Sequence, residues 1–294
     1  MADLAPGDPV RVVHATAALR DACREARAAG RRVAVVPTMG ALHAGHLALV
    51  DEARRNADFV VVTIFVNPLQ FGPNEDFARY PRTLTEDVAH CAERGVDLVF
   101  APERAAMYPE GFSTTVHVAG VTEPLEGAHR PGHFDGVTTI VAKLFGLVGE
   151  SVAVFGRKDY QQWKVITRMT RDLELPIELV GHPTIREADG LALSSRNRYL
   201  DADARQRALG IVIGLRAASK AFDAGERDPS ALELVARAEV EARFDRIDYL
   251  AVRHAETLAP LDGPVQDRAV VVVAAHLGKT RLIDNLVLGE ESAP

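Results

Sequence analysis

The chain has 294 residues, of which 47% are hydrophobic and 26% charged, and its formal net charge is −7. This length is enough for one large domain or two medium ones with a sizeable core. The negative balance argues against a protein that binds duplex nucleic acid, because such proteins usually carry a basic excess.

The cysteines and the N-terminal segment bear on the compartment. Cys23 and Cys91 are too few for a disulfide framework and fit no zinc motif, so we expect two buried thiols in a reducing environment. Residues 1–9 contain acids, glycine and prolines, which is not typical of a signal peptide. No window approaches the roughly 18 consecutive apolar residues of a membrane helix. We therefore expect a cytoplasmic protein with no membrane segment.

The first two thirds of the chain alternates short apolar runs with helical patterns. The runs expected to be strands are 32–36, 59–66, 96–100, 152–155 and 177–180. The segments expected to be helices are 46–56, 83–94, 138–148 and 160–173. Apolar strands that alternate with helices predict a parallel sheet covered on both faces, which is a Rossmann-like, doubly wound α/β fold. Ligands of such folds bind beyond the carboxyl ends of the strands.

The pattern changes after about residue 200. Helices are expected at 201–224 and 229–243, and strands at 247–253, 269–276 and 281–288. Two helices followed by strands suggest a small α+β domain. We therefore expect a Rossmann-like domain over 1–185 and a smaller C-terminal domain over 186–294.

The strongest local signal is the segment VPTMGALHAGH at 36–46, between a predicted strand and a predicted helix. A helix start receives phosphate well, because its backbone N–H groups are unpaired and its dipole end is positive. Gly40 and Gly45 allow tight turns, and His43 and His46 can donate hydrogen bonds to phosphate oxygens. A structural histidine pair is the alternative. Neither a GxGxxG nor a GxxxxGK[ST] loop is present, so we expect no dinucleotide cofactor and no Walker loop.

Amide side chains follow the second predicted strand. Asn67 and Gln70 can hold a hydroxy acid without competing as nucleophiles, although turn chemistry around Pro68 explains the same residues. The polar segment 72–79 is a candidate mobile flap.

Cationic groups follow later. Lys158, after the strand 152–155, can neutralise phosphate charge, and Gln162 can face the same crevice; a solvated surface lysine is the alternative. Ser194, Ser195 and Arg196 can clamp phosphate or simply cap a helix. Within the loop 125–136, Arg130 is the best candidate for an anion ligand, and a structural loop is equally favoured.

Several of these strings together resemble the pantoate–β-alanine ligase (pantothenate synthetase) family of the HIGH/KMSKS nucleotidyltransferase superfamily. The resemblance covers about residues 32–285. It rests on 36–46, 65–71, 80–83, 130–136, 155–162 and 191–197. Two positions depart from the family pattern: Ile185 stands where valine is frequent, and Arg157 where glutamate is frequent. Only the local charge beside Lys158 is affected.

The resemblance implies that ATP and (R)-pantoate form pantoyl-adenylate and pyrophosphate, and that β-alanine then attacks to give pantothenate and AMP. It also implies Mg²⁺ and a homodimer. The candidate ATP ligands are Pro37, Thr38, Met39, Gly40, His43, Gly45, His46, Gly156, Lys158, Asp159, Ile185, Leu193, Ser194, Ser195 and Arg196. The candidate catalytic residues are His43, His46, Lys158 and Arg196. The candidate substrate ligands are Asn67, Gln70, Gln162 and Arg130, of which Gln70 and Gln162 resemble the family's pantoate-binding pair. We expect no metal ligand set, no nucleic acid and no membrane as partners.

In such a reaction the nucleophile is the substrate carboxylate, which is ionised at neutral pH. No side-chain nucleophile is needed, and catalysis consists mostly of alignment and charge stabilisation. We find no convincing general base for the amine step. An adenylyltransferase that keeps AMP in its product shares many of these motifs, as does an aminoacyl-tRNA synthetase, which the acidic balance and chain length disfavour. A nucleotide-sensing module would need only the binding groups.

Overall fold

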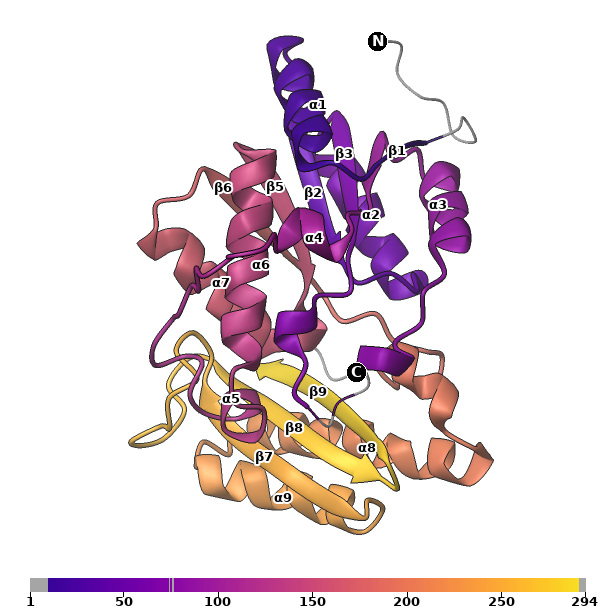
Figure 1. Cartoon of the computed structure of the whole chain (residues 1–294). Coiled ribbons are helices and arrows are strands. Elements are labelled where there is room, and N and C mark those ends of the chain that lie inside the picture. The colour runs from indigo at the N-terminus through magenta and orange to yellow at the C-terminus, as the bar shows by residue number, and fades with distance from the viewer. Residues whose placement is uncertain (1–9, 74, 76, 291–294) are drawn as a thin grey trace. The chain divides into compact units, whose positions relative to one another are not determined.

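The computed structural model of the chain describes residues 10–73, 75 and 77–290, so the N-terminal segment 1–9 and parts of the 72–79 segment lie outside the described residues. It contains two compact units (Figure 1). Unit 1 comprises Met1–Ala119, Arg130–Arg157 and Val165–Pro183, and unit 2 comprises Gly120–His129, Lys158–Lys164 and Thr184–Pro294. These units are defined by how densely the chain packs, whereas a domain is a segment that could fold by itself. Separate domains over 1–185 and 186–294 therefore stay a prediction.

Unit 1 is built on a parallel sheet in the order β1-β4-β3-β2-β5-β6. Its strands are β1 (Arg11–Val13), β2 (Val33–Thr38), β3 (Phe59–Ile64), β4 (Leu98–Phe100), β5 (Ser151–Gly156) and β6 (Ile177–His182). The chain runs outward from β2 to β4 and then returns to place β5 on the other side of β2, where Ala34 pairs with Val152. This reversal is the topological switch point at which doubly wound folds bind ligands.

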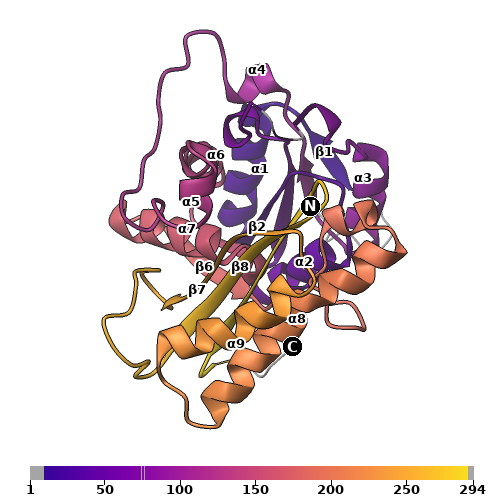
Figure 2. The ribbon, with the colours of Figure 1, turned by 90° about the horizontal axis from the view of Figure 1, so that it is seen from below.

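Helices cover both faces of this sheet. They are α1 (Thr16–Ala28), α2 (Ala44–Asn56), α3 (Leu84–Glu93), α6 (His133–Val148) and α7 (Tyr160–Asp172), with short turns α4 (Arg104–Met107) and α5 (Glu126–His129). Helices α2 and α3 lie together on one face, and α1 and α6 lie together on the other (Figures 1 and 2). Alternate strand residues such as Val36, Val62 and Val154 are buried against Val50 of α2. The doubly wound prediction is therefore confirmed.

The sequence missed β1 and α1. The segment 36–46 consequently follows the second strand and opens the second helix, not the first of each. Strand β1 has only three residues, which is too short for a clear pattern, whereas α1 buries Leu19, Ala22, Cys23 and Ala26 at helical spacing on one face. Helix α6 begins at His133, five residues before its predicted start, because Gly132 adopts the left-handed conformation (φ 79°) that precedes it.

Unit 2 contains an antiparallel sheet of β7 (Arg246–His254), β8 (Ala269–Leu277) and β9 (Thr280–Leu288). Helices α8 (Ala202–Asp223) and α9 (Pro229–Glu241) pack on one face of it, as Figure 1 shows. Asp201 and Asp228 cap the two helices with their carboxylates. The core contains Leu215, Leu232, Val271 and Leu286 among others. This arrangement confirms the predicted α+β part.

The two thiols are free and buried, as predicted. Burial raises the pKa of Cys23 to about 11 and that of Cys91 to about 12, so both stay protonated at neutral pH. Over the described residues, no helix combines the length and apolar character needed to cross a bilayer.

Candidate active site

The loop that joins β2 to α2 forms a tight turn, which we call the glycine–histidine turn (residues 39–46). Thr38, the last residue of β2, fixes the entry to this turn. Its hydroxyl donates to the Thr63 carbonyl of β3 (2.7 Å) and accepts from Gly40 N (3.2 Å). Gly40 has a φ of +83°, and a Cβ there would lie 3.0 Å from both Asp87 Oδ2 and the Ile64 side chain. Glycine is therefore required by both the backbone conformation and the space.

Asp87 of α3 holds this turn. Its carboxylate is 1% exposed and accepts hydrogen bonds from Ala41 N (3.0 Å), Leu42 N (2.7 Å) and the Thr83 hydroxyl (3.2 Å). A buried carboxylate is tolerated only when it is well hydrogen-bonded, and here backbone N–H groups supply that. The sequence prediction missed Asp87, although an acid four residues before the buried Cys91 on one helical face was a usable signal.

The two histidines form a reciprocal cap at the start of α2. His43 is the N-cap, and its Nδ1 accepts from Gly45 N (3.1 Å), while His46 Nδ1 accepts from His43 N (3.4 Å). Because each Nδ1 accepts, a neutral ring carries its proton on Nε2 and can donate there. The rings lie together, with centroids 4.2 Å apart. Both rings are half-buried at a helix start, which suits contact with an anion.

A cavity of about 310 Å³ lies beside the glycine–histidine turn at the carboxyl ends of β2, β3 and β4. Met39 and Gly40 form part of its wall, and Ile64, Phe65 and Val66 form another part. Arg82 and Arg104 are also among the lining residues. The turn therefore borders open space on the side where the doubly wound fold is expected to bind ligands.

Asn67 and Gln70 lie in a 3-10 turn, η1 (Pro68–Gln70), and its cap. Asn67 is 1% exposed. Its Nδ2 donates to Gln70 Oε1 (3.1 Å) and to the Gly136 carbonyl (3.0 Å). Its Oδ1 accepts from Tyr108 OH (2.7 Å) and from Leu69 N (3.3 Å). All four hydrogen-bonding positions of the amide are thus used. Gln70 is half-buried, and its Nε2 lies 3.1 Å from the Met39 sulfur. Asn67 therefore orients Gln70 beside the glycine–histidine turn.

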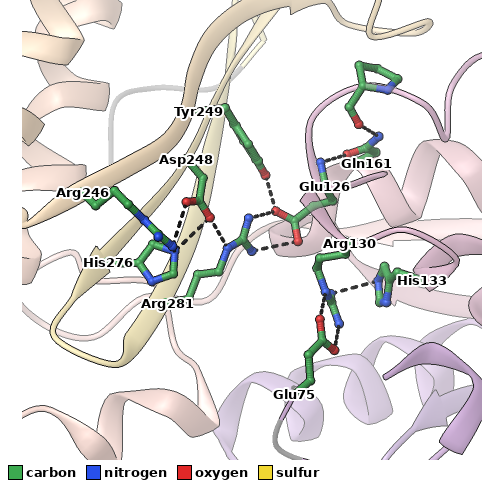
Figure 3. Close-up of polar contacts among 11 residues, drawn as sticks. Glu75, Glu126, Arg130, His133, Gln161, Arg246, Asp248, Tyr249, His276 and Arg281 are labelled. Carbon is green, nitrogen blue, oxygen red and sulfur yellow. Dashed lines mark hydrogen bonds and ion pairs between the residues drawn. The ribbon is translucent and has the colours of Figure 1, made fainter. Parts of the chain in front are cut away.

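Arg130 lies in an ion pair within unit 1 (Figure 3). Its Nε and Nη2 donate to the two oxygens of Glu75 (2.7 Å each), and Nη1 lies 3.1 Å from His133 Nε2. Burial would raise the pKa of Glu75, but the hydrogen bonds and charge of Arg130 outweigh it and lower the pKa overall. Because the Arg130 guanidinium is already paired with the Glu75 carboxylate, the structure favours a structural role for the loop 125–136 over binding of a ligand anion.

Unit 2 gathers several predicted phosphate ligands around one narrow pocket. Lys158 lies in η3 (Arg157–Asp159), and Ser194 and Arg196 lie at the start of η4 (Ser195–Tyr199). We call this the cation pocket; its lining residues are Lys158, Leu191, Ala192, Ser194, Arg196, Asn197, Ile211, Arg281, Leu282, Ile283 and Asp284. Ser194 also caps η4 by accepting from Arg196 N (3.2 Å), so the N-cap alternative holds for its hydroxyl.

A hairpin carries the serine–arginine segment to this pocket. Arg186 forms an antiparallel bridge with Ala192, and Leu193 N donates to the Ile185 carbonyl (2.9 Å). Asn197 braces the hairpin by donating to Glu187 Oε1 (2.7 Å) and to the Ala192 carbonyl (3.1 Å). This backbone hydrogen bond places the predicted ligands Ile185 and Leu193 side by side on the two arms of the hairpin.

Two adjacent glutamines at the start of α7 have different surroundings. Gln161 is buried and binds the backbone of the 120–129 segment: its Oε1 accepts from Glu126 N (2.9 Å), and its Nε2 donates to the carbonyls of Val121 and Pro124 (2.9 and 2.8 Å). Gln162 is half-buried, and among the described residues its amide has no hydrogen-bond partner. Gln162 is therefore the one whose amide can bind a ligand.

Arg281 lines the cation pocket but is neutralised by carboxylates (Figure 3). Its Nη atoms donate to both oxygens of Glu126 (2.6 and 2.9 Å), and its Nε donates to Asp248 (2.7 Å). Tyr249 OH also donates to Glu126 (2.7 Å), and burial beside this carboxylate raises the pKa of Tyr249. Arg281 thus tethers the 120–129 segment to the unit 2 sheet. In the described parts of the chain, no group of three or more His, Cys, Asp or Glu side chains is placed to hold a metal ion.

A family model described as pantoate-beta-alanine ligase matches residues 11–287. The chain belongs to this ligase family. Relatives in the family include pantothenate synthetase 1 of Bradyrhizobium diazoefficiens, 52% identical over 95% of this chain and 98% of its own length. Pantothenate synthetase of Chromohalobacter salexigens is 56% identical over 92% of this chain and 95% of its own length.

Solved structures of the ligase family have the same fold. Pantothenate synthetase of Thermus thermophilus superposes with a TM-score of 0.89 at 50% identity, covering 94% of this chain and 99% of that one. Pantoate-beta-alanine ligase of Francisella tularensis, crystallised with beta-gamma ATP and beta-alanine, has a TM-score of 0.76 at 29% identity and covers 97% and 100% of the two chains. The Rossmann-like fold with an added α+β part is therefore that of the family.

The predicted site residues fall into two sets. Unit 1 holds Pro37, Thr38, Met39, Gly40, His43, Gly45, His46, Asn67, Gln70, Arg130 and Gly156, and brings Met39, Asn67 and Gln70 together. Unit 2 holds Lys158, Asp159, Gln162, Ile185, Leu193, Ser194, Ser195 and Arg196, and brings Lys158, Ser194 and Arg196 together. Sequence reasoning missed the residues that hold these groups in place, namely Asp87, Tyr108, Asp284 and Asn285.

Proposed function

We propose that this member of the ligase family condenses (R)-pantoate with β-alanine in an ATP-dependent reaction that passes through pantoyl-adenylate and releases pyrophosphate and AMP. The observation that carries the proposal is the clustering of Lys158, Ser194 and Arg196 in one pocket of a chain that matches the ligase family over residues 11–287. The names of the relatives and the ATP and beta-alanine in the Francisella structure support it.

In the first step the pantoate carboxylate attacks the α-phosphorus of ATP, and pyrophosphate leaves. The reacting phosphate gains negative charge, which Nε2–H groups of His43 and His46 and the cations of Lys158 and Arg196 are suited to stabilise. The backbone of the glycine–histidine turn and the start of α2 add further N–H donors. The substrate supplies an ionised nucleophile, so these groups need only align and neutralise charge.

Pantoate is a hydroxy acid, and amides suit it because they donate and accept without adding charge. Gln70 and Gln162 are proposed to orient it, and Asn67 to act through Gln70, since its own amide is fully used. In the second step the amine of β-alanine attacks the acyl carbon and AMP leaves, while the amine proton passes to solvent.

Mg²⁺ is proposed to enter with ATP and to neutralise phosphate charge while bound. Asp159, an exposed carboxylate beside Lys158, would hold the ion, and phosphate oxygens and water would supply its other ligands. We also propose that the protein acts as a homodimer in the cytoplasm, as the family resemblance implies.

The test of the function is product analysis. ATP, pantoate and β-alanine are incubated with the protein, each substrate is omitted in turn, and pantothenate, AMP and pyrophosphate are quantified. Equal amounts of pantothenate and AMP are expected only with all three substrates. A product that retains AMP after β-alanine addition would identify an adenylyltransferase, and ATP binding without turnover would identify a nucleotide sensor.

A further inference from the structure

Two adjacent polar residues interrupt the apolar stretch 282–288 of strand β9 in unit 2. Asp284 and Asn285 of β9 are each 4% exposed, although Leu282, Leu286 and Val287 around them are apolar. Burial of polar side chains costs free energy unless each is hydrogen-bonded. The pair therefore needs partners, and those partners lie in the two segments that line the cation pocket.

Asn285 holds the segment that carries Lys158. Its Nδ2 donates to the Lys158 carbonyl at 2.8 Å. Lys158 is the middle residue of η3, a 3-10 turn of only three residues that joins β5 directly to α7. An external donor at this carbonyl sets where the Lys158 side chain begins.

Asp284 holds the other segment. Its carboxylate accepts from Arg186 Nη1 (2.7 Å) and Nη2 (3.1 Å), in a pair whose side chains are largely buried, and it also accepts from Asn285 N (2.8 Å). Arg186 belongs to the hairpin that leads into Ser194 and Arg196. Neighbouring strand residues point to opposite faces, so two consecutive positions reach two different segments.

We propose that Asn285 is a positioning residue that fixes Lys158 in the cation pocket, with Asp284 doing the same for the serine–arginine hairpin. This inference rests on the proposed role of Lys158 in adenylate formation. Asn285 does not itself contact substrate in this scheme, so its effect on catalysis runs through Lys158.

A double-mutant cycle in pantoate-dependent ATP–pyrophosphate exchange tests the inference. Asn285→Ala is expected to lower kcat/KM for ATP about tenfold, the size expected for one lost hydrogen bond that leaves a buried carbonyl unpaired. In the Lys158→Ala background the same substitution is expected to change the rate by less than about twofold, because its target is already gone. If thermal unfolding shows that the Asn285→Ala protein is not folded, Asn285→Ser is used in its place. The serine hydroxyl is too short to reach the Lys158 carbonyl, so the same hydrogen bond is lost.

The matched control is Val271→Ala, which removes a buried side chain from β8 on the face covered by the helices. It is expected to lower Tm, and any loss of rate should be additive with Lys158→Ala. Additivity of Asn285→Ala with Lys158→Ala, or wild-type exchange in both Asn285 variants, overturns the positioning role. Wild-type exchange in Lys158→Ala instead removes Lys158 from the proposed mechanism, and with it any action of Asn285 through Lys158.

Discussion

The glycine–histidine turn of unit 1 and the cation pocket of unit 2 both face phosphate in the proposed reaction, but they are stabilised differently. The turn is made of consecutive residues whose backbone is set by glycine, by the His43–His46 cap and by one buried carboxylate, Asp87. The pocket is made of separate segments, and its shape depends on ion pairs and on Asp284 and Asn285.

The difference indicates how each region should respond to change. The turn is tightly packed around Gly40, where a Cβ would lie 3.0 Å from Asp87 Oδ2 and the Ile64 side chain, so it is sensitive to added volume. The pocket region contains buried carboxylates paired with arginines, so it is sensitive to acid and to the loss of one partner. The following substitutions test this contrast in the exchange rate, in the packing and in the response to acid.

His46→Ala is expected to lower pantoate-dependent ATP–pyrophosphate exchange by about 10²-fold, the typical loss for one donor to developing negative charge. The cap of α2 loses the 3.4 Å hydrogen bond to His46 Nδ1 and keeps the 3.1 Å bond to His43 Nδ1, so a small change in Tm is expected. His14→Ala, at an exposed histidine, is the matched control and should leave exchange unchanged. Exchange at wild-type rate in His46→Ala would remove the histidine from the mechanism.

Gly136→Ala is expected to destabilise the protein by about 1–3 kcal/mol, or more if the backbone cannot move, because overpacking forces structural shifts. A Cβ at this position would lie 2.2 Å from the Leu69 carbonyl oxygen and 2.6 Å from Gln70 N. The displacement of Gln70 should also raise the KM for pantoate.

Gly146→Ala in the same helix is the matched control, since a Cβ there meets nothing within 4 Å. It should stabilise the protein by about 0.5–1 kcal/mol through helix propensity. Thermal unfolding and pantoate kinetics check both variants. Equal behaviour of the two would contradict the proposed close contact between α6 and η1.

Gln162→Ala is expected to raise the KM for pantoate about fivefold with a small change in kcat, because a hydrogen bond from a neutral amide contributes about 1 kcal/mol. Pantoate titrations of the exchange reaction measure it. An unchanged KM for pantoate would show that Gln162 does not orient the substrate, whatever the effect of other variants.

Acid should destabilise unit 2 through Asp248. Burial alone would raise the pKa of this carboxyl, but hydrogen bonds from Arg281 and His276 hold it at about 2. A group whose pKa is lowered by folding stabilises the protein above its unfolded pKa of about 3.9 and loses that contribution as the pH falls toward 2. The contribution is on the order of 2 kcal/mol at pH 7.

Asp248→Asn should therefore lower Tm at pH 7 and show a smaller further loss between pH 4 and pH 2 than the wild type. Glu290→Gln, which breaks the exposed pair with Arg268, is the control and should shift stability by less than about 1 kcal/mol. Parallel Tm curves for Asp248→Asn and the wild type over this range would show that the carboxylate does not carry the acid sensitivity.

Much of the fold was predictable because its signals are local. The apolar runs that became β2, β3 and β5 and the helices α8 and α9 were recognised from local residue patterns alone, and the structure adds that Asp201 and Asp228 cap the two helices. The glycine–histidine turn was recognised for the same reason, since its glycines and its histidine cap are neighbours in sequence. β1 was missed because three residues give no clear period, whereas α1 was missed although Leu19, Ala22, Cys23 and Ala26 recur at helical spacing on one buried face.

From the sequence alone the candidate side chains of the site could be named, because histidine, lysine, arginine and amide groups that follow predicted strands are visible in residue type and motif. Only the tertiary structure decided which partners hold them: Asp87 beneath the turn, Tyr108 and Gly136 at Asn67, and Asn285 at Lys158. The physical reason is that these contacts join segments far apart in the chain. A buried Asp or Asn looks the same in sequence whether it supports a site or not, and packing alone fixes its hydrogen-bond partner.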